Sequence, residues 1–151
     1  MKVDANSIEE LFIASGEREA DLRAIDQLIV EAAPELKRQL FSGPSITMLG
    51  YGEMTWESKS SSGVWPLLGV APQKGNISIY VAAERDGIPL AQIYNKKRLG
   101  KVNNGKNCIR FKRLVDVNLV ELRNAILDAI EWSKVQERMY GRNCAQPVPE
   151  Q

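Results

Sequence analysis

The hydrophobic positions in the first part of the chain repeat at helical spacing. Ser7 and Glu10 form a capping box, which predicts a short helix that Gly16 ends. From about 17 to 33, apolar residues fall on one stripe of a second helix, and Pro34 breaks this pattern. The stripe consists of Leu22, Ile25, Leu28, Ile29 and Ala32.

After Phe41 the pattern changes from helix to strand. Before that point, Pro34 is expected to open a short turn through Leu36 and Leu40. Polar turns rich in Gly, Ser and Pro then separate apolar runs, each of which we predict as an antiparallel strand. The predicted strands are 46–56 with an irregularity at 50–52, 64–71, 76–81 and 108–111.

Shorter signals organise the rest of the chain. Asn104-Gly105 predicts a two-residue hairpin turn before the strand at 108–111, and 89–94 is expected to be a short helix or turn. Asn118 and Glu121 resemble a helix cap, which predicts a long helix to about 139. Its apolar stripe is Leu119, Leu122, Ile126, Ala129 and Ile130.

This order of elements predicts an α+β fold. We expect a two-layer sandwich with N-terminal helices, about five antiparallel strands and a C-terminal helix packed on one face of the sheet. At 151 residues the chain has the size of one domain, assigned to residues 1–140. Residues 141–151 contain Gly141, Pro147 and Pro149 and are expected to form a flexible C-terminal tail.

The composition excludes much chemistry, because the chain contains no histidine. Serine or cysteine nucleophiles activated by imidazole and histidine metal sites are therefore excluded within one chain. We expect a non-enzymatic protein. Cys108 and Cys144 lack the spacing of a zinc or redox motif and fit a reducing compartment. The beginning of the chain has no signal-peptide pattern, and no apolar run could span a bilayer, which predicts a cytoplasmic protein without membrane contact.

Charge is strongly segregated along the chain, although the net charge is only +1. Residues 87–115 carry eight basic and no acidic side chains. Such a run attracts anions where folding gathers it on one surface. The alternative is an ordinary solvated face that pairs with acidic helices elsewhere. The basic residues are Lys96, Lys97, Arg98, Lys101, Lys106, Arg110, Lys112 and Arg113.

Spaced Gly-Lys pairs followed by an Ile-Arg-Phe strand give the chain a family resemblance. The chain resembles the YdhG-like domain of unknown function (number 1801) over nearly its whole length. This resemblance implies a YdhG-like or frataxin-like fold and small cytoplasmic bacterial proteins without an established reaction. It also implies a possible frataxin-type role in handling iron. The matching segments are Ala20 to Pro34, Gly50-Tyr-Gly52, Gln73-Lys74, Ile77 to Tyr80, Leu99-Gly-Lys101, Gly105-Lys106, Cys108 to Leu114, and Asp116.

One candidate site combines basic side chains with glycine turns. Glycine lets the backbone approach an anion closely and present N–H groups, while Lys and Arg supply the opposite charge. We therefore predict binding of a small anionic ligand or an acidic protein partner. The alternative is that the glycines form tight turns and the lysines protect sheet edges. The candidate residues are Lys74, Gly75, Lys101, Gly105, Lys106 and Arg110.

A second candidate site lies on the acidic N-terminal helices. Carboxylates suit exposed iron or other divalent-metal sites, and Glu17, Asp21 and Glu31 fall near one flank of the apolar stripe. Iron is the cofactor under this alternative, and otherwise no cofactor is expected. A solvated helix surface explains the same residues. The acidic and basic faces could also pair with each other in a homodimer.

Nucleic acid is a less favoured partner. Tyr94 and Phe111 lie in the basic segment and could stack on bases. However, the isoelectric point near 7.7 and the absence of a nucleic-acid-binding motif argue against this. Phe111 is expected to pack inward. Cys108 is expected to be buried, although a thiol between Lys106 and Arg110 would be reactive if it pointed outward.

Overall fold

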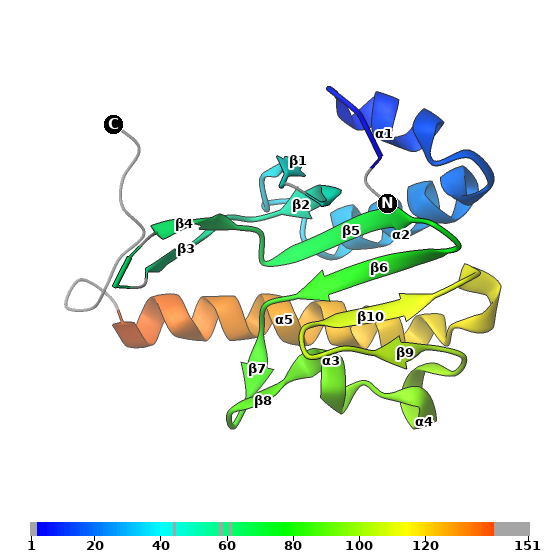
Figure 1. Ribbon diagram of the computed structural model, residues 1–151. Helices are drawn as coiled ribbons and strands as arrows, with labels where there is room; N and C mark the ends of the chain where they lie inside the picture. The colour runs from blue at the N-terminus through cyan, green and yellow to red at the C-terminus, as the bar shows by residue number, and fades with distance from the viewer. Residues whose placement is uncertain (1–2, 44, 58, 61, 141–151) are drawn as a thin grey trace.

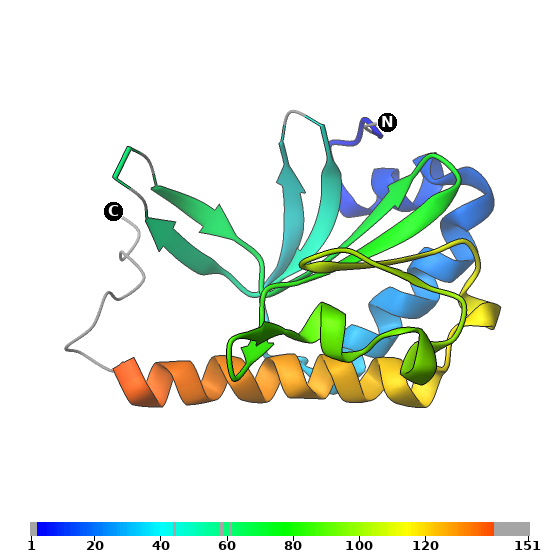
Figure 2. The ribbon, with the colours of Figure 1, turned by 60° about the horizontal axis from the view of Figure 1, so that its bottom comes forward.

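The predicted α+β sandwich is confirmed. The computed structural model describes residues 3–43, 45–57, 59–60 and 62–140. Figure 1 shows one twisted antiparallel sheet with its long helices packed on one face, and Figure 2 shows the C-terminal helix lying along that layer. The helices are α1 (Ile8–Ala14), α2 (Glu19–Ala32), α3 (Leu90–Ile93), α4 (Lys96–Leu99) and α5 (Leu119–Tyr140), with 3₁₀ turns at Gly16–Arg18 and Leu114–Asp116. The predicted tail, 141–151, lies outside the described residues.

The main sheet has six strands rather than about five. Its order is β1-β2-β5-β6-β10-β9. Two small hairpins, β3–β4 and β7–β8, pair only within themselves. The strands are β1 (Arg38–Ser42), β2 (Thr47–Tyr51), β3 (Met54–Glu57), β4 (Ser62–Trp65), β5 (Leu68–Gln73), β6 (Asn76–Val81), β7 (Glu84–Arg85), β8 (Ile88–Pro89), β9 (Asn103–Asn104) and β10 (Cys108–Phe111).

The sixth strand is β1, where a short turn was predicted through Leu36 and Leu40. That prediction is wrong from Arg38 onward, because the segment pairs with β2 as an edge strand. Leu40 lies opposite Leu49 on the core side. Phe41 covers the other side, where a Cβ added to Gly50 would lie only 2.4 Å from its ring. The alternation that directs these two side chains to opposite faces is that of a strand.

Two predicted strands are each divided in the structure. The run 46–56 separates into β2 and β3 at Gly52, whose φ of +77° lies in the left-handed region. The Gly52 N–H donates to Lys37 O at 2.8 Å, which ends β2 beside β1. The run 64–71 separates into β4 and β5 at Pro66, which has no N–H for a sheet ladder. The β3–β4 hairpin therefore projects from the main sheet (Figure 2).

The predicted hairpin between β9 and β10 is present, but its turn lies two residues further along. The Gly105 N–H donates to Cys108 O at 2.8 Å, which places Lys106 and Asn107 at the turn. Asn104 has a different role. Its side-chain amide donates to Ala91 O at 2.6 Å and to Tyr94 O at 2.9 Å, and so joins β9 to α3.

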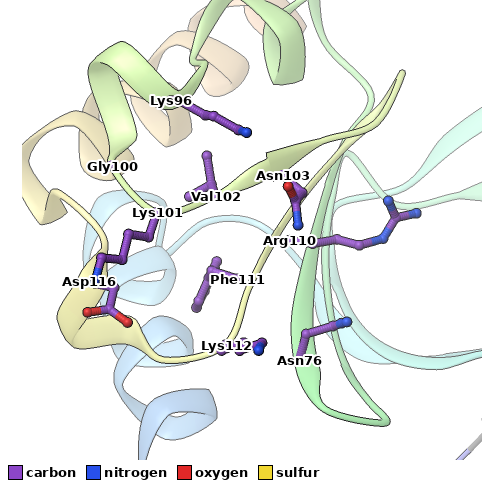
Figure 3. A pocket seen from close by; sticks show the side chains of 10 residues that line it. All are labelled: Asn76, Lys96, Gly100, Lys101, Val102, Asn103, Arg110, Phe111, Lys112 and Asp116. Carbon is purple, nitrogen blue, oxygen red and sulfur yellow. The ribbon is translucent and has the colours of Figure 1, made fainter.

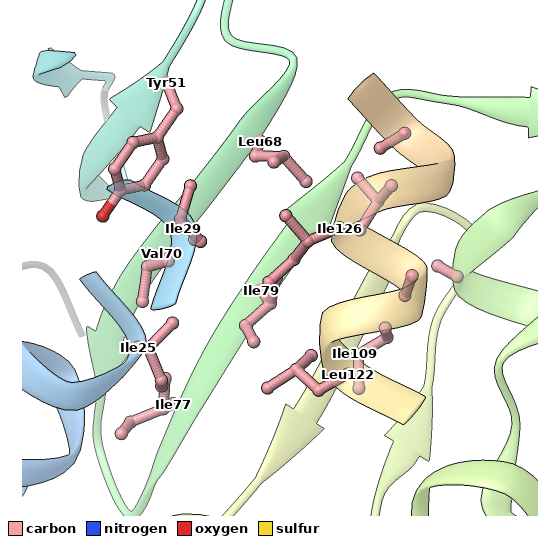
Figure 4. Close-up of a cluster of buried hydrophobic side chains, with 14 of the residues drawn as sticks. Ile25, Ile29, Tyr51, Leu68, Val70, Ile77, Ile79, Ile109, Leu122 and Ile126 are labelled. Atoms are coloured by element: carbon pink, nitrogen blue, oxygen red, sulfur yellow. The ribbon is translucent and has the colours of Figure 1, made fainter. Parts of the chain in front are cut away.

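The core lies between the sheet and helices α2 and α5. Figure 4 shows Ile25 and Ile29 of α2 and Leu122 and Ile126 of α5 facing the inward side chains of the sheet. The sheet contributes Leu68, Val70, Ile77, Ile79 and Ile109. Leu119 is a correction to the predicted α5 stripe, because it is 48% exposed at the first turn of the helix. Within the described residues, no helix has both the length and the apolar character needed to cross a membrane.

Both long helices are joined to the rest of the fold by a Tyr-Asp-Arg unit. In the first unit, Asp26 of α2 accepts the Tyr51 hydroxyl at 2.7 Å and two Arg38 nitrogens at 2.8 and 2.6 Å. Burial, followed by the charge of Asp26, raises the pKa of Tyr51 far above its usual value.

The second unit repeats this chemistry on α5. Asp128 accepts the Tyr94 hydroxyl and, at 2.7 Å, an Arg85 nitrogen. The Arg98 guanidinium lies 4.0 Å from the centre of the Tyr94 ring. The Tyr94 side chain is buried. Burial and the neighbouring Asp128 carboxylate raise the pKa of Tyr94 to about 12.

Alkaline pH is expected to destabilise the protein through these tyrosines. Above about pH 10 the unfolded chain loses its tyrosine protons while the folded chain keeps them. The free energy of unfolding should therefore fall by about 1.4 kcal/mol per pH unit for each tyrosine. For Tyr94 this loss continues until the pH reaches its folded pKa of about 12. Urea denaturation at several pH values above 9 measures the slope.

The matched control for the alkaline effect is Tyr94→Phe. This variant keeps the ring but has no proton to lose. Between about pH 10 and 12, the slope of its free energy of unfolding against pH should be smaller than that of the unmodified protein by about 1.4 kcal/mol per pH unit. An unchanged slope in Tyr94→Phe would show that Tyr94 ionises equally in the folded and unfolded chains.

Candidate anion-binding site

A pocket of about 480 Å³ lies at the start of β9, where the preceding residues diverge from β10. β9 has only two residues, and the segment before it is held by the chain that enters α5. The Lys101 N–H donates to Asp116 O at 3.3 Å, and the Asn118 N–H donates to Leu99 O at 2.8 Å. Gly100 forms an isolated antiparallel bridge with Val117. Residues 100–102 therefore leave the end of β10 uncovered, and this gap is the pocket.

The pocket combines an apolar floor with a basic rim. Val102 and Phe111 line it, and each of them is only 3% exposed. Asp116 is its one acidic lining residue, and this side chain pairs with Arg113 at 3.6 Å. Four cations complete the rim: Lys96, Lys101, Arg110 and Lys112.

The cations around the pocket come from different elements. Figure 3 shows Lys96 extending from α4 toward Asn103, while Lys101 extends toward Asp116 on the opposite wall. Lys112 follows directly after β10. Arg110 occupies the outer face of β10, and its guanidinium points away from Lys101. The pocket therefore has cations at several points of its rim, with Asp116 as an acidic side chain on one wall.

These four cations differ from several arginines of the chain, because they form no ion pair with any residue that the structure describes. Arg23, Arg38, Arg85 and Arg98 each form an ion pair of 2.9 Å or shorter with a carboxylate. Within the part of the chain that the structure describes, the four rim cations make no ion pair and no side-chain hydrogen bond. The folded chain thus leaves an uncompensated positive charge at the pocket.

One further polar group lies at the pocket without a hydrogen-bond partner among the described residues. The side-chain oxygen of Asn76, another lining residue, is buried without a hydrogen-bond partner. Buried polar groups usually have partners, so an unpaired one beside a pocket is typical of a ligand site.

The structure brings together only part of the predicted anion site. Lys101 and Arg110 line the pocket. Lys74 and Gly75 form the turn between β5 and β6, next to the lining residue Asn76, and Gly75 has a φ of +79° as the turn requires.

The other two predicted residues belong to the β9–β10 turn. Gly105 lies close to the side chains of Cys108 and Arg110, since an added Cβ would be 2.7 Å from Cys108 Sγ and 3.5 Å from Arg110 Nη1. Lys106 follows it and does not line the pocket. Lys96 and Lys112 also line the pocket, and both lie in the acid-free segment 87–115, although the Gly-Lys pattern does not indicate them.

The predicted acidic site is not assembled. Asp21 and Glu31 are ten residues apart on α2, which separates them by about 15 Å along the helix axis. Asp21 accepts the Leu114 N–H at 3.0 Å, and Glu31 accepts the side chain of Gln27 at 3.0 Å. Glu17 lies outside α2, in the preceding 3₁₀ turn. No group of three potential metal ligands occurs among the described residues.

Three further candidate residues, Tyr94, Phe111 and Cys108, are buried. Tyr94 is 2% exposed and Phe111 is 3% exposed, so neither ring is available to stack on a base. Cys108 is a free thiol that is buried, as predicted. Tyr80 packs edge-on against Trp65, with ring centres 6.4 Å apart, which is ordinary aromatic packing.

Comparisons with family models, with curated proteins and with solved structures return no match for this chain. The resemblance to the YdhG-like domains therefore stays a prediction. The proposed function therefore rests on the geometry of the basic pocket alone.

Proposed function

We propose that this protein binds a small anionic ligand in the pocket rimmed by Lys96, Lys101, Arg110 and Lys112. The observation that carries the proposal is the absence of acidic partners for these four cations among the described residues, beside a pocket of about 480 Å³. Pockets for small ligands have volumes of about 300–1,000 Å³ and combine apolar walls with a few polar groups. A cytoplasmic metabolite fits this description.

The physical reason is that the pocket lowers the cost of binding a charge. Like charges held together repel one another, and an anion placed between them relieves this repulsion. Charge-assisted hydrogen bonds from Lys and Arg to a carboxylate or phosphate are also about twice as strong as neutral ones. The floor of Val102 and Phe111 keeps water away from one side of the ligand, which strengthens these bonds. A concave site of this kind favours a small ligand over an acidic protein surface.

The test is thermal unfolding in the presence of a panel of anionic metabolites, followed by calorimetric titration of any that stabilise the protein. A ligand at about a hundred times its Kd adds about 2.7 kcal/mol to the free energy of unfolding. This corresponds to a rise in Tm of about 5–11 °C for a chain of this size. The double variant Lys101→Ala/Arg110→Ala should weaken binding by about tenfold or more.

The chain offers a control with the same loss of charge. Lys74→Ala/Lys106→Ala removes two cations that line neither wall of the pocket. Its affinity should stay within about twofold of the unmodified protein. Equal losses in the two double variants would indicate general charge attraction instead of a site. Failure of every anion to stabilise the unmodified protein would overturn the proposal.

A further inference from the structure

A second hollow adjoins the basic pocket. It has a volume of about 470 Å³ and is lined by Asn95, Lys96, Lys97, Asn103 and Asn104. Two of these residues, Lys96 and Asn103, also line the first pocket. Figure 3 shows the Lys96 side chain extending from α4 toward Asn103, so this pair forms the boundary between the hollows.

The cations are divided between the two hollows. Lys101, Arg110 and Lys112 belong to the first alone, Lys97 belongs to the second alone, and Lys96 is shared. No acidic residue lines the second hollow. Lys97, like the rim cations, makes no side-chain ion pair or hydrogen bond among the described residues. A single small anion in the first pocket would leave the charge of Lys97 uncompensated.

The walls of the second hollow are held in place by the fold. The Asn95 side chain accepts the Lys97 N–H at 3.0 Å and so caps α4. The Asn104 side chain is fixed by its two bonds to the carbonyls of Ala91 and Tyr94. The position of α4 relative to β9 is therefore set before any ligand binds, and a rigid site loses less entropy on binding.

We propose that the ligand carries two anionic groups, one bound in each hollow, with Lys96 between them. This inference rests on the proposed function and names the class of its ligand: a linear molecule with two separated phosphoryl groups. The first group is held by Lys101 and Lys112. The second group is held by Lys97. Asn103, on the boundary, lies beside the part of the molecule that connects the two groups.

The experiment compares ligands that differ in the number and spacing of their anionic groups. Inorganic phosphate, tripolyphosphate and hexose 1,6-bisphosphate are titrated calorimetrically at low salt, and the titration is repeated at about 150 mM salt. Tripolyphosphate or the bisphosphate should bind about tenfold or more tightly than phosphate. The affinity for either of these two ligands should also fall more steeply with salt than the affinity for phosphate, because more charges are neutralised on binding.

The variant Lys97→Ala distinguishes this inference from the proposed function. It should weaken binding of the ligand with two groups by about fivefold or more, while phosphate binding stays within about twofold. The control Lys134→Ala removes an exposed lysine of α5 that lines neither hollow and should change neither affinity.

The outcomes separate the two ideas. Phosphate binding that depends on Lys101 but gains nothing from a second group would overturn the inference and leave the proposed function standing. The same holds if Lys97→Ala weakens both ligands equally. If no phosphorylated probe and no other anion binds, both the inference and the proposed function are overturned.

Discussion

Replacing Asp26 by alanine is expected to lower the free energy of unfolding by about 3 kcal/mol. The substitution removes the acceptor of the buried Tyr51 hydroxyl and of both Arg38 nitrogens at once. A buried hydroxyl without a partner costs about 1–3 kcal/mol. The Arg38 side chain is 34% exposed and can turn to water, which limits its share of the loss. Urea denaturation monitored by circular dichroism measures the change.

Two variants control this prediction. Glu31→Ala removes a carboxylate from the same helix where it only bonds to Gln27 at the surface, and should cost less than about 0.5 kcal/mol. Tyr51→Phe removes one hydrogen bond but leaves the ion pair, and should fall between the other two. A loss below about 1 kcal/mol in Asp26→Ala would mean that the Tyr-Asp-Arg unit contributes little to stability.

Gly100→Ala is expected to destabilise the protein by about 3 kcal/mol, for two separate reasons. Gly100 has φ +100° and ψ −132°, a conformation that only glycine adopts without strain. In addition, an added Cβ would lie 2.7 Å from the backbone oxygen of Asp116, which cannot move without loosening the start of α5. The same denaturation measurement applies, and ligand binding in the pocket should weaken in parallel.

The control for Gly100 is a glycine that has the strain without the close contact. Gly75 has a φ of +79°, and an added Cβ there would meet no atom within 4 Å. Gly75→Ala should therefore cost only about 1 kcal/mol. If both variants lose the same free energy, the contact with Asp116 contributes nothing and the backbone conformation alone explains the requirement for glycine.

Most of the fold could be predicted from local signals. Ser7 caps α1 as expected, with the Glu10 N–H donating to its side chain at 3.1 Å. Asn118 caps α5 in the same way, by accepting the Glu121 N–H at 3.2 Å. In each cap the two partners are only three residues apart, so a short window of the sequence contains both of them. The alternation of Ile77, Ile79 and Val81 likewise predicts an inward face, and all three are buried.

The errors occurred where distant residues decide the structure. β1 forms because Leu40 and Phe41 have a neighbouring strand to pair with, and a window around Pro34 contains no sign of that partner. The turn after β9 lies at Lys106 because the Asn104 side chain is already bound to α3, ten or more residues earlier in the chain. Local turn propensity is overridden in such cases by tertiary contacts.

The candidate site was predictable in its charge but not in its composition. The acid-free segment identified the correct stretch, yet only the departure of residues 100–102 from β10 decides which lysines share a pocket. Lys106 follows a glycine, as Lys101 does, but it lies at the turn of the β9–β10 hairpin and not beside the pocket. Asp21 and Glu31 share a helix flank, but they lie about 15 Å apart along α2, a separation that their shared flank does not reveal.

The backbone bonds between 99–101 and 116–118 have a mechanical consequence. One wall of the pocket is fastened to residues 116–118, which lead directly into α5, and α5 covers the core through Leu122 and Ile126. The wall cannot swing outward unless the hydrogen bonds between Lys101 and Asp116 and between Asn118 and Leu99 break. Opening of the pocket is therefore coupled to the segment from which the longest helix begins.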